Sequence, residues 1–133
     1  MLIIILLIGL IAAITGLIIF IKNKNEIDLK KIKIFMFFFF LVSIPDVFTT
    51  YLFTKKLGIH YEGNLLARTL MYKFGIVWGM FLAKLIAFPI IFFISMIPLY
   101  AEFKTGKPFF KAYAIAFIAI GIIICINNFL NAL

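Results

Sequence analysis

Four long apolar runs, separated by shorter segments that hold most of the charged residues, dominate the pattern of this chain. The runs lie near residues 2–21, 34–54, 74–100 and 109–130. Each is long enough to cross a bilayer, which takes about 20 residues of α-helix. The pattern predicts an all-α polytopic membrane protein, a four-transmembrane-helix bundle in which residues 1–133 form a single integral membrane domain.

The first run, residues 2–21, lies where a secretory signal peptide would lie. No basic residue precedes it, and its apolar stretch is longer than the core of a usual signal peptide. We therefore interpret this run as a retained helix rather than as a cleaved segment.

The composition makes lipid the solvent for most of the chain. Hydrophobic residues occupy 66% of the 133 positions and charged residues only 14%, too few polar side chains to cover a soluble domain of this size. The net charge of +8 would suit nucleic acid in a soluble protein. Here the basic residues lie between apolar runs, as they do in cytoplasmic loops and in contacts with lipid headgroups. We therefore expect membrane lipid as a partner and no nucleic acid.

The distribution of Lys and Arg predicts the orientation. Loops 22–33 and 101–108, with Lys111 just inside the last run, hold eight of these residues, whereas the segment 55–73 holds four. By the positive-inside rule we expect a multi-pass protein of the cell membrane, with loops 22–33 and 101–108 in the cytoplasm and both termini outside.

Two charged residues lie deep inside apolar runs, Asp46 in the second and Lys84 in the third. A charge at this depth costs at least about 2.5–3.5 kcal/mol, so it usually faces the bundle interior and has a partner. Both residues lie roughly 12–15 Å below the outer boundary of the membrane, from the rise per residue of an α-helix. Because unlike charges at one depth recover much of each other's desolvation cost, we predict a buried salt bridge between Asp46 and Lys84.

Further polar residues lie on the same side of the predicted membrane. Thr49 and Thr50 follow Asp46 at i+3 and i+4, so the three residues share a helix face. Each threonine is either a packing residue or a hydrogen-bonding neighbour of the acid. Near the end of the last run, Asn127 and Asn128 either mark the end of the helix or close a site from that helix.

The outer loop, residues 55–73, is the least hydrophobic part of the chain. Asn64 is placed to cap a short helix, and the residues after it predict a short outer amphipathic segment that lies in the membrane interface or folds over the bundle. Glu62 and Arg68 are near enough in sequence to pair, and a re-entrant loop would bring them toward Asp46. The alternative is an ordinary solvated loop.

The candidate binding site joins these residues: Asp46, Thr49, Thr50, Glu62, Asn64, Arg68 and Lys84. No catalytic residue is assigned, since the chain has no nucleotide loop, nucleophile elbow, zincin motif or thiol pair. His60 is the only histidine, which excludes a multi-histidine metal site within one chain. A ligand set of Asp46, His60 and Glu62 rests on ligand type alone, and we expect no metal and no cofactor.

The order of Asp46, Thr49, Thr50, Gly58, Glu62 and Asn64 resembles the signature of a family of small uncharacterised prokaryotic four-helix integral membrane proteins. That signature runs Asp-x-x-Thr-Thr…Gly-x-x-x-Glu-x-Asn-Pro. Leu65 stands where the family has proline, so the turn after Asn64 is expected to be looser here. The family is a domain of unknown function. The resemblance implies that the polar residues form one site, and it implies no activity.

Small residues recur every four positions along the third run, at Gly75, Gly79, Ala83 and Ala87. A stripe of small residues lets another helix backbone approach closely. The approaching helix belongs either to the same chain or to a second copy, and we consider a homo-oligomer through this face.

The favoured interpretation is an integral membrane protein whose buried polar site, in the outer half of the bundle, binds an ion or small solute for transport or sensing. One alternative is a membrane-embedded enzyme that acts on a lipid-phase substrate, with Asp46 or Glu62 as general base and Lys84 as the group that holds an anion. Another is a structural or assembly subunit whose charge pair only fixes helix packing. The sequence leaves the ligand and the choice among these classes open.

Overall fold

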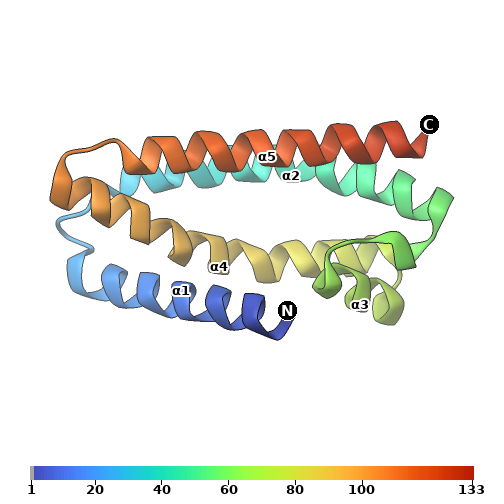
Figure 1. The fold of residues 1–133 in the computed structure, drawn as a ribbon, viewed down its shortest axis with the longest axis horizontal. Coiled ribbons are helices and arrows are strands. Elements are labelled where there is room, and N and C mark those ends of the chain that lie inside the picture. Colours follow the sequence, from blue (N-terminus) through green and yellow to red (C-terminus); the bar gives the residue numbers. More distant parts are fainter. Residues whose placement is uncertain (1) are drawn as a thin grey trace. The chain divides into compact units, whose positions relative to one another are not determined.

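The computed structural model describes residues 2–133, with side chains from residue 7 onward, and this part of the chain is all-α (Figure 1). Its elements in chain order are α1 (Leu2–Asn23), α2 (Leu29–Leu57), the 3₁₀ turn η1 (Ile59–Tyr61), α3 (Leu65–Phe74), α4 (Ile76–Thr105) and α5 (Phe109–Ala132).

Three of these helices are long and apolar enough to cross a membrane: α2, α4 and α5. They contain the predicted runs 34–54 and 109–130 and nearly all of 74–100. The first predicted run, 2–21, lies in α1, but the stretch of α1 with described side chains, Leu7–Asn23, is shorter than a span. The all-α class and the membrane-like helices are confirmed, whereas the four-span bundle is not.

Local sequence explains where several helices begin and end. Asp28 Oδ1 accepts the N–H of Lys30 at 3.0 Å at the start of α2, and Asn64 Oδ1 accepts the N–H of Ala67 at 3.2 Å at the start of α3. Both contacts satisfy N–H groups that lack a partner in the first helical turn. Gly75 and Gly106 follow α3 and α4 with φ of 83° and 69°, a conformation that favours glycine and ends a helix.

The chain forms two compact units. Within the described residues, the first contains the residues up to Phe37 together with Phe88–Ala116, and the second contains Phe38–Ala87 and Phe117–Leu133. Helices α2, α4 and α5 each contribute residues to both units, whereas α1 belongs to the first and α3 to the second.

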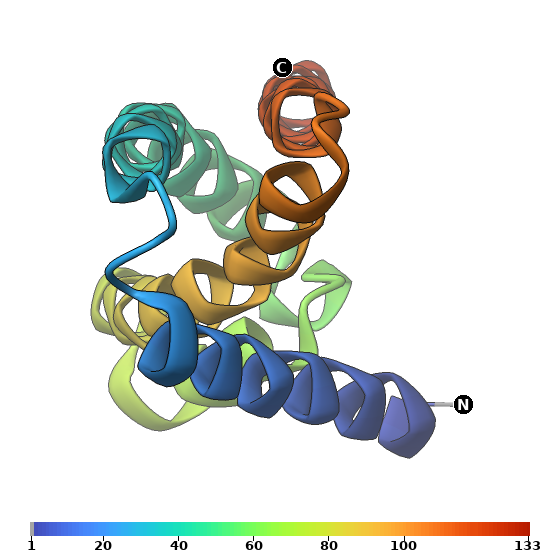
Figure 2. The same ribbon diagram turned by 90° about the vertical axis from the view of Figure 1, so that its left-hand side faces the viewer.

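In the first unit, α1 lies beside the C-terminal half of α4 (Figures 1 and 2). Gly16 is buried there, and a Cβ at this position would lie 1.7 Å from the carbonyl oxygen of Phe93. The ring of Phe20 packs edge-on against the rings of Phe92 and Phe93. The close approach of the two backbones therefore depends on the absence of a side chain at Gly16.

An ion pair between Lys31 and Glu102 connects the start of α2 to the end of α4 in the same unit. The second carboxylate oxygen of Glu102 accepts the N–H of Phe110 at 3.0 Å, in the first turn of α5. Segments 22–33 and 101–108, predicted as loops, include the start of α2 and the end of α4 and lie at one end of this unit (Figure 1).

In the second unit, α3 packs against α4. Ala67 and Met71 of α3 are buried with Met80 and Ala83 of α4, and Val47 of α2 packs against this cluster. The segment after Asn64 in the predicted outer loop is therefore a short helix that packs against α4 within this unit.

Two of the four small residues predicted as a packing stripe contact α3. Gly79 is buried, and a Cβ there would lie 2.4 Å from Met71 Cα, while Ala83 belongs to the same buried cluster. The close neighbour of this part of the stripe is thus a helix of the same chain. The homo-oligomer through this face remains an untested prediction.

Helix α5 packs against α2 in the second unit (Figure 1). The rings of Phe39 and Phe117 meet edge-on with centroids 5.7 Å apart, and a Cβ at Gly121 would lie 2.9 Å from Cγ1 of Val42. In this packing, the face of α2 that holds Asp46 and Thr50 is directed toward α4 and α5, which contact these two residues.

Candidate functional site

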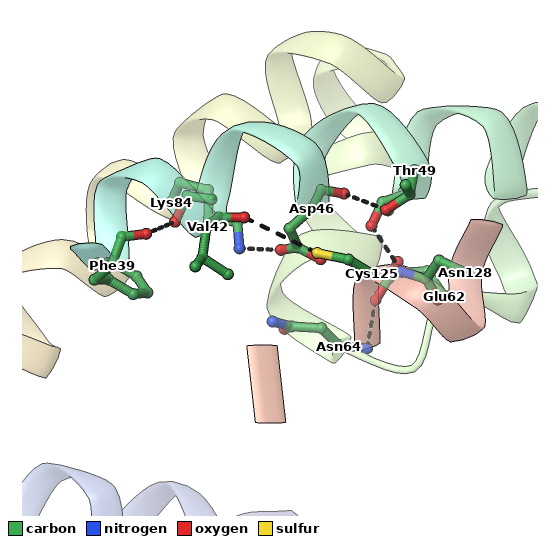
Figure 3. A network of polar contacts seen from close by, with 11 residues as sticks. Phe39, Val42, Asp46, Thr49, Glu62, Asn64, Lys84, Cys125 and Asn128 are labelled. Carbon is green, nitrogen blue, oxygen red and sulfur yellow. Dashed lines mark hydrogen bonds and ion pairs between the residues drawn. The ribbon is translucent and has the colours of Figure 1, made fainter. Parts of the chain in front are cut away.

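Asp46 and Lys84 form an ion pair between α2 and α4, through Asp46 Oδ2 and Lys84 Nζ (Figure 3). Asp46 lies about three turns before the end of α2, and Lys84 lies about two turns after the start of α4. The two helices run in opposite directions, with η1 and α3 between them in the chain, so a residue before the end of α2 can meet one after the start of α4 (Figure 1). The predicted pairing of the two charges is confirmed.

The predicted burial of this pair is wrong. The side chain of Lys84 is 34% exposed and that of Asp46 is 19% exposed, and the described part of the chain contains no buried charged residue. The physical reason is that pairing needs one contact between two helices, whereas burial needs side chains on every side of the charges. Among the described residues, the two charged side-chain groups bond only to each other.

The bonding of the pair is incomplete. In the part of the chain that the structure describes, Lys84 Nζ bonds to Asp46 Oδ2 and to no other group, and Asp46 Oδ1 has no hydrogen-bond partner. An ammonium group has three N–H donors and a carboxylate has two acceptor oxygens. Two donors of Lys84 and one oxygen of Asp46 are therefore left for a third group.

Three threonines next to Asp46 form a buried polar row on α2: Thr49, Thr50 and Thr54. The hydroxyl of Thr49 donates to the backbone oxygen of Asp46 at 3.3 Å, and that of Thr54 donates to the backbone oxygen of Thr50 at 2.8 Å. Neither of these hydroxyls donates to the carboxylate of Asp46. The threonines are thus packed hydrogen-bonding residues of the helix contact, and the i+3 and i+4 spacing correctly placed two of them on the face of Asp46.

Helix α5 contributes two residues to this region. Asn128 Nδ2 donates to the hydroxyl of Thr50 at 3.1 Å, so one of the two asparagines does close the polar region from the last helix (Figure 3). Cys125 is buried, and its Sγ lies 3.9 Å from the backbone oxygen of Val42. Spacing alone did not distinguish Asn128 from Asn127, because both lie near the end of the same run. The exposed Asn127 instead accepts a hydrogen bond from Asn131.

The three loop residues of the candidate set form hydrogen bonds within the loop and the start of α3. Glu62 Oε1 accepts the N–H of Asn64 at 2.8 Å, and Asn64 caps α3 through Ala67. Arg68 Nη1 donates to the backbone oxygen of His60 at 3.3 Å.

The pairing of Glu62 with Arg68 that the sequence allows does not form, since each side chain bonds to nearby backbone instead. Among the described side chains, Glu62, Asn64 and Arg68 make no hydrogen bond to Asp46 or Lys84. The structure therefore brings together Asp46, Thr49, Thr50 and Lys84, adds Asn128, and keeps the loop residues as a separate group.

The described residues include no group of three His, Cys, Asp or Glu side chains placed to hold a metal ion. The combination of Asp46, His60 and Glu62 therefore does not gather into a ligand set. The chemistry available at the site is that of one cation, one anion, hydroxyls and a carboxamide.

Comparison with known families gives a match to one family model. The model described as a domain of unknown function, DUF5658, matches residues 37–133, which include the site from Asp46 to Asn128. The chain belongs to the DUF5658 family. The match includes the positions on which the resemblance rests, while the signature itself and a prokaryotic origin remain predictions. No curated protein and no solved structure matches the chain.

Proposed function

We propose that the Asp46–Lys84 pair is the binding site for a small ion or charged solute, in a protein that transports or senses it. The observation that carries this proposal is that the pair is formed but incompletely bonded and only half-buried. A fully paired, enclosed ion pair has no capacity for a third group, whereas this one offers free donors and a free acceptor.

An ion pair inside a membrane should bind charged solutes in preference to neutral ones. An ionised group far from bulk water is unfavourable unless it is neutralised, so a charged solute that replaces one partner must bring the compensating charge. An anion would bind Lys84, and a cation or a proton would bind Asp46. Exchange of partners is therefore the chemistry that we assign to the site.

We further propose that the chain crosses the cell membrane four times, with both termini outside. The three long apolar helices support a membrane location, and the apolar α1 would supply the fourth span. The Lys31–Glu102 ion pair supports a common side for loops 22–33 and 101–108, which the positive-inside rule assigns to the cytoplasm.

A structural role is the second candidate, because the contact between Asp46 and Lys84 is direct and links two helices. In that case the pair would set the packing of α2 against α4 and bind nothing else. The experiment must therefore distinguish loss of a ligand from loss of the fold.

The test is native mass spectrometry of the purified protein in a mild detergent, comparing wild type with Asp46→Asn. Glu102→Gln is the matched control, because it removes an ionised carboxylate from the other ion pair, which lies in the other unit. We expect an additional mass on wild type and on Glu102→Gln that is lost from folded Asp46→Asn.

If Asp46→Asn does not fold, the double variant Asp46→Asn with Lys84→Met removes both charges and leaves no unpaired group. An additional mass on the folded double variant would contradict a site at this pair. The absence of any bound mass on wild type, with a folding defect in Asp46→Asn, would assign the pair to helix packing.

A further inference from the structure

One end of the first unit carries a group of exposed lysines that the proposed binding site does not use. We call it the lysine surface, and it consists of Lys22, Lys24, Lys30, Lys31, Lys33, Lys104, Lys107 and Lys111. The residues come from two segments of the sequence, 22–33 and 104–111, which include the ends of α1 and α4 and the starts of α2 and α5. The ion pair between Lys31 and Glu102 joins the start of α2 to the end of α4, so both segments contribute to one end of the unit (Figure 1).

The region holds three acidic residues, Glu26, Asp28 and Glu102, against the eight lysines. Glu102 uses one oxygen for Lys31 and the other for the N–H of Phe110. Asp28 accepts the backbone N–H of Lys30 at the start of α2. Among the described side chains, Lys31 is the only member of the lysine surface with an ion-pair partner. The surface therefore keeps an excess of positive charge among the described residues.

Aromatic side chains accompany the cations. Lys104 Nζ lies 5.5 Å from the ring centroid of Tyr100 and 5.4 Å from that of Phe103. Phe103 and Phe109 are each 46% exposed. Aromatic rings beside long amphipathic lysines are typical of the boundary between hydrocarbon and headgroups, where the rings contact acyl chains and the ammonium groups extend to the polar layer. A purely aqueous polyanion would gain nothing from the exposed rings.

We propose that the lysine surface binds the phosphate groups of anionic membrane lipids. Each lysine close to an anionic bilayer strengthens binding by about five-fold, and the effect is confined to roughly one Debye length. Several lysines on one surface therefore give a strong preference for anionic over zwitterionic lipid. This site is separate from the Asp46–Lys84 pair, which lies in the second unit.

The test is native mass spectrometry of the full chain in detergent, titrated with phosphatidylglycerol or with phosphatidylcholine. The test variant combines Lys104→Gln, Lys107→Gln and Lys111→Gln, which leaves the Lys31–Glu102 pair intact. The control variant combines Lys55→Gln, Lys56→Gln and Lys73→Gln in the second unit. Both variants lose the same charge. The test set includes one lysine that lies over aromatic rings, Lys104, and the control set includes two, Lys55 and Lys73.

We expect wild type and the control variant to bind phosphatidylglycerol at least about ten-fold more tightly than phosphatidylcholine. The test variant should lose most of this preference, and added salt should reduce it in wild type. Replacement of the same three lysines by arginine should retain it, which separates charge from folding defects. The proposal is overturned if wild type does not discriminate between the lipids, or if the test and control variants lose the preference equally.

Discussion

Gly79 of α4 lies directly against the backbone of Met71 in α3. A Cβ on Gly79 would be 2.4 Å from both the backbone nitrogen and the Cα of Met71, whose side chain is 1% exposed. No rotation of a side chain relieves a clash with backbone, so α3 must move to accommodate any larger residue. The position of α3 on the bundle thus depends on one missing side chain.

Gly79→Ala should therefore destabilise the protein by about 1–3 kcal/mol, the usual range for overpacking. The sign of the stability change is informative, because the same Gly→Ala substitution at an open helical position should stabilise the protein by up to about 1 kcal/mol through helix propensity. Gly9→Ala is the matched control, because nothing lies within 4 Å of a Cβ there. Unfolding titrations in mixed detergent micelles measure the stability change of both variants. A stabilised Gly79→Ala variant would show that α3 does not pack against this position.

The ion pair predicts strong coupling between Asp46 and Lys84. Asp46→Asn and Lys84→Met should each cost roughly 1–3 kcal/mol, because each leaves a charge without its partner at membrane depth. The double variant should lose clearly less than the sum of the two. A double-mutant cycle on the free energy of unfolding measures this coupling, with the exposed Lys55→Met as control. Additive effects would mean that the two side chains do not interact.

Asn128 should contribute to the stability of the folded protein, whereas Asn127 should contribute little. Asn128→Ala removes the hydrogen bond to the buried Thr50, and such bonds between membrane helices contribute about 0.6 kcal/mol on average. Asn127 is exposed and bonds within its own helix, so Asn127→Ala should change stability by less than about 0.5 kcal/mol. Unfolding titrations of the two variants provide the comparison. A larger loss of stability for Asn127→Ala than for Asn128→Ala would show that Asn127, and not Asn128, contacts α2.

Glu102 should contribute more to stability than its partner Lys31. Glu102→Ala removes the ion pair and also the acceptor for the N–H of Phe110 at the start of α5, and the loss of such a cap costs about 1 kcal/mol. Lys31→Ala removes only an exposed ion pair, which contributes little. The difference is measurable by unfolding titration. Equal losses for the two variants would indicate that the carboxylate acts only through Lys31.

Much of the helix content was predictable because the signals are local. An apolar run long enough to span a bilayer specifies a helix through its own backbone hydrogen bonds, so α2, α4 and α5 appear where the runs appear. Asn64 was correctly predicted to cap α3, since the cap and the N–H that it accepts are three residues apart. The pairing of Asp46 with Lys84 was also predictable, because helix rise fixes the depth of a residue from its sequence position.

What the sequence could not determine were contacts that depend on how the helices rotate and approach each other. It showed a stripe of small residues but not that Gly79 faces Met71 of the same chain, and it showed two asparagines but not that Asn128 reaches Thr50. It predicted a buried ion pair, whereas both side chains of the pair are partly exposed. The sequence by itself determined the helices and the positions of the charged residues along them, because both follow from distances along one chain. Only the tertiary structure decided the partners and the burial, because these follow from distances between helices.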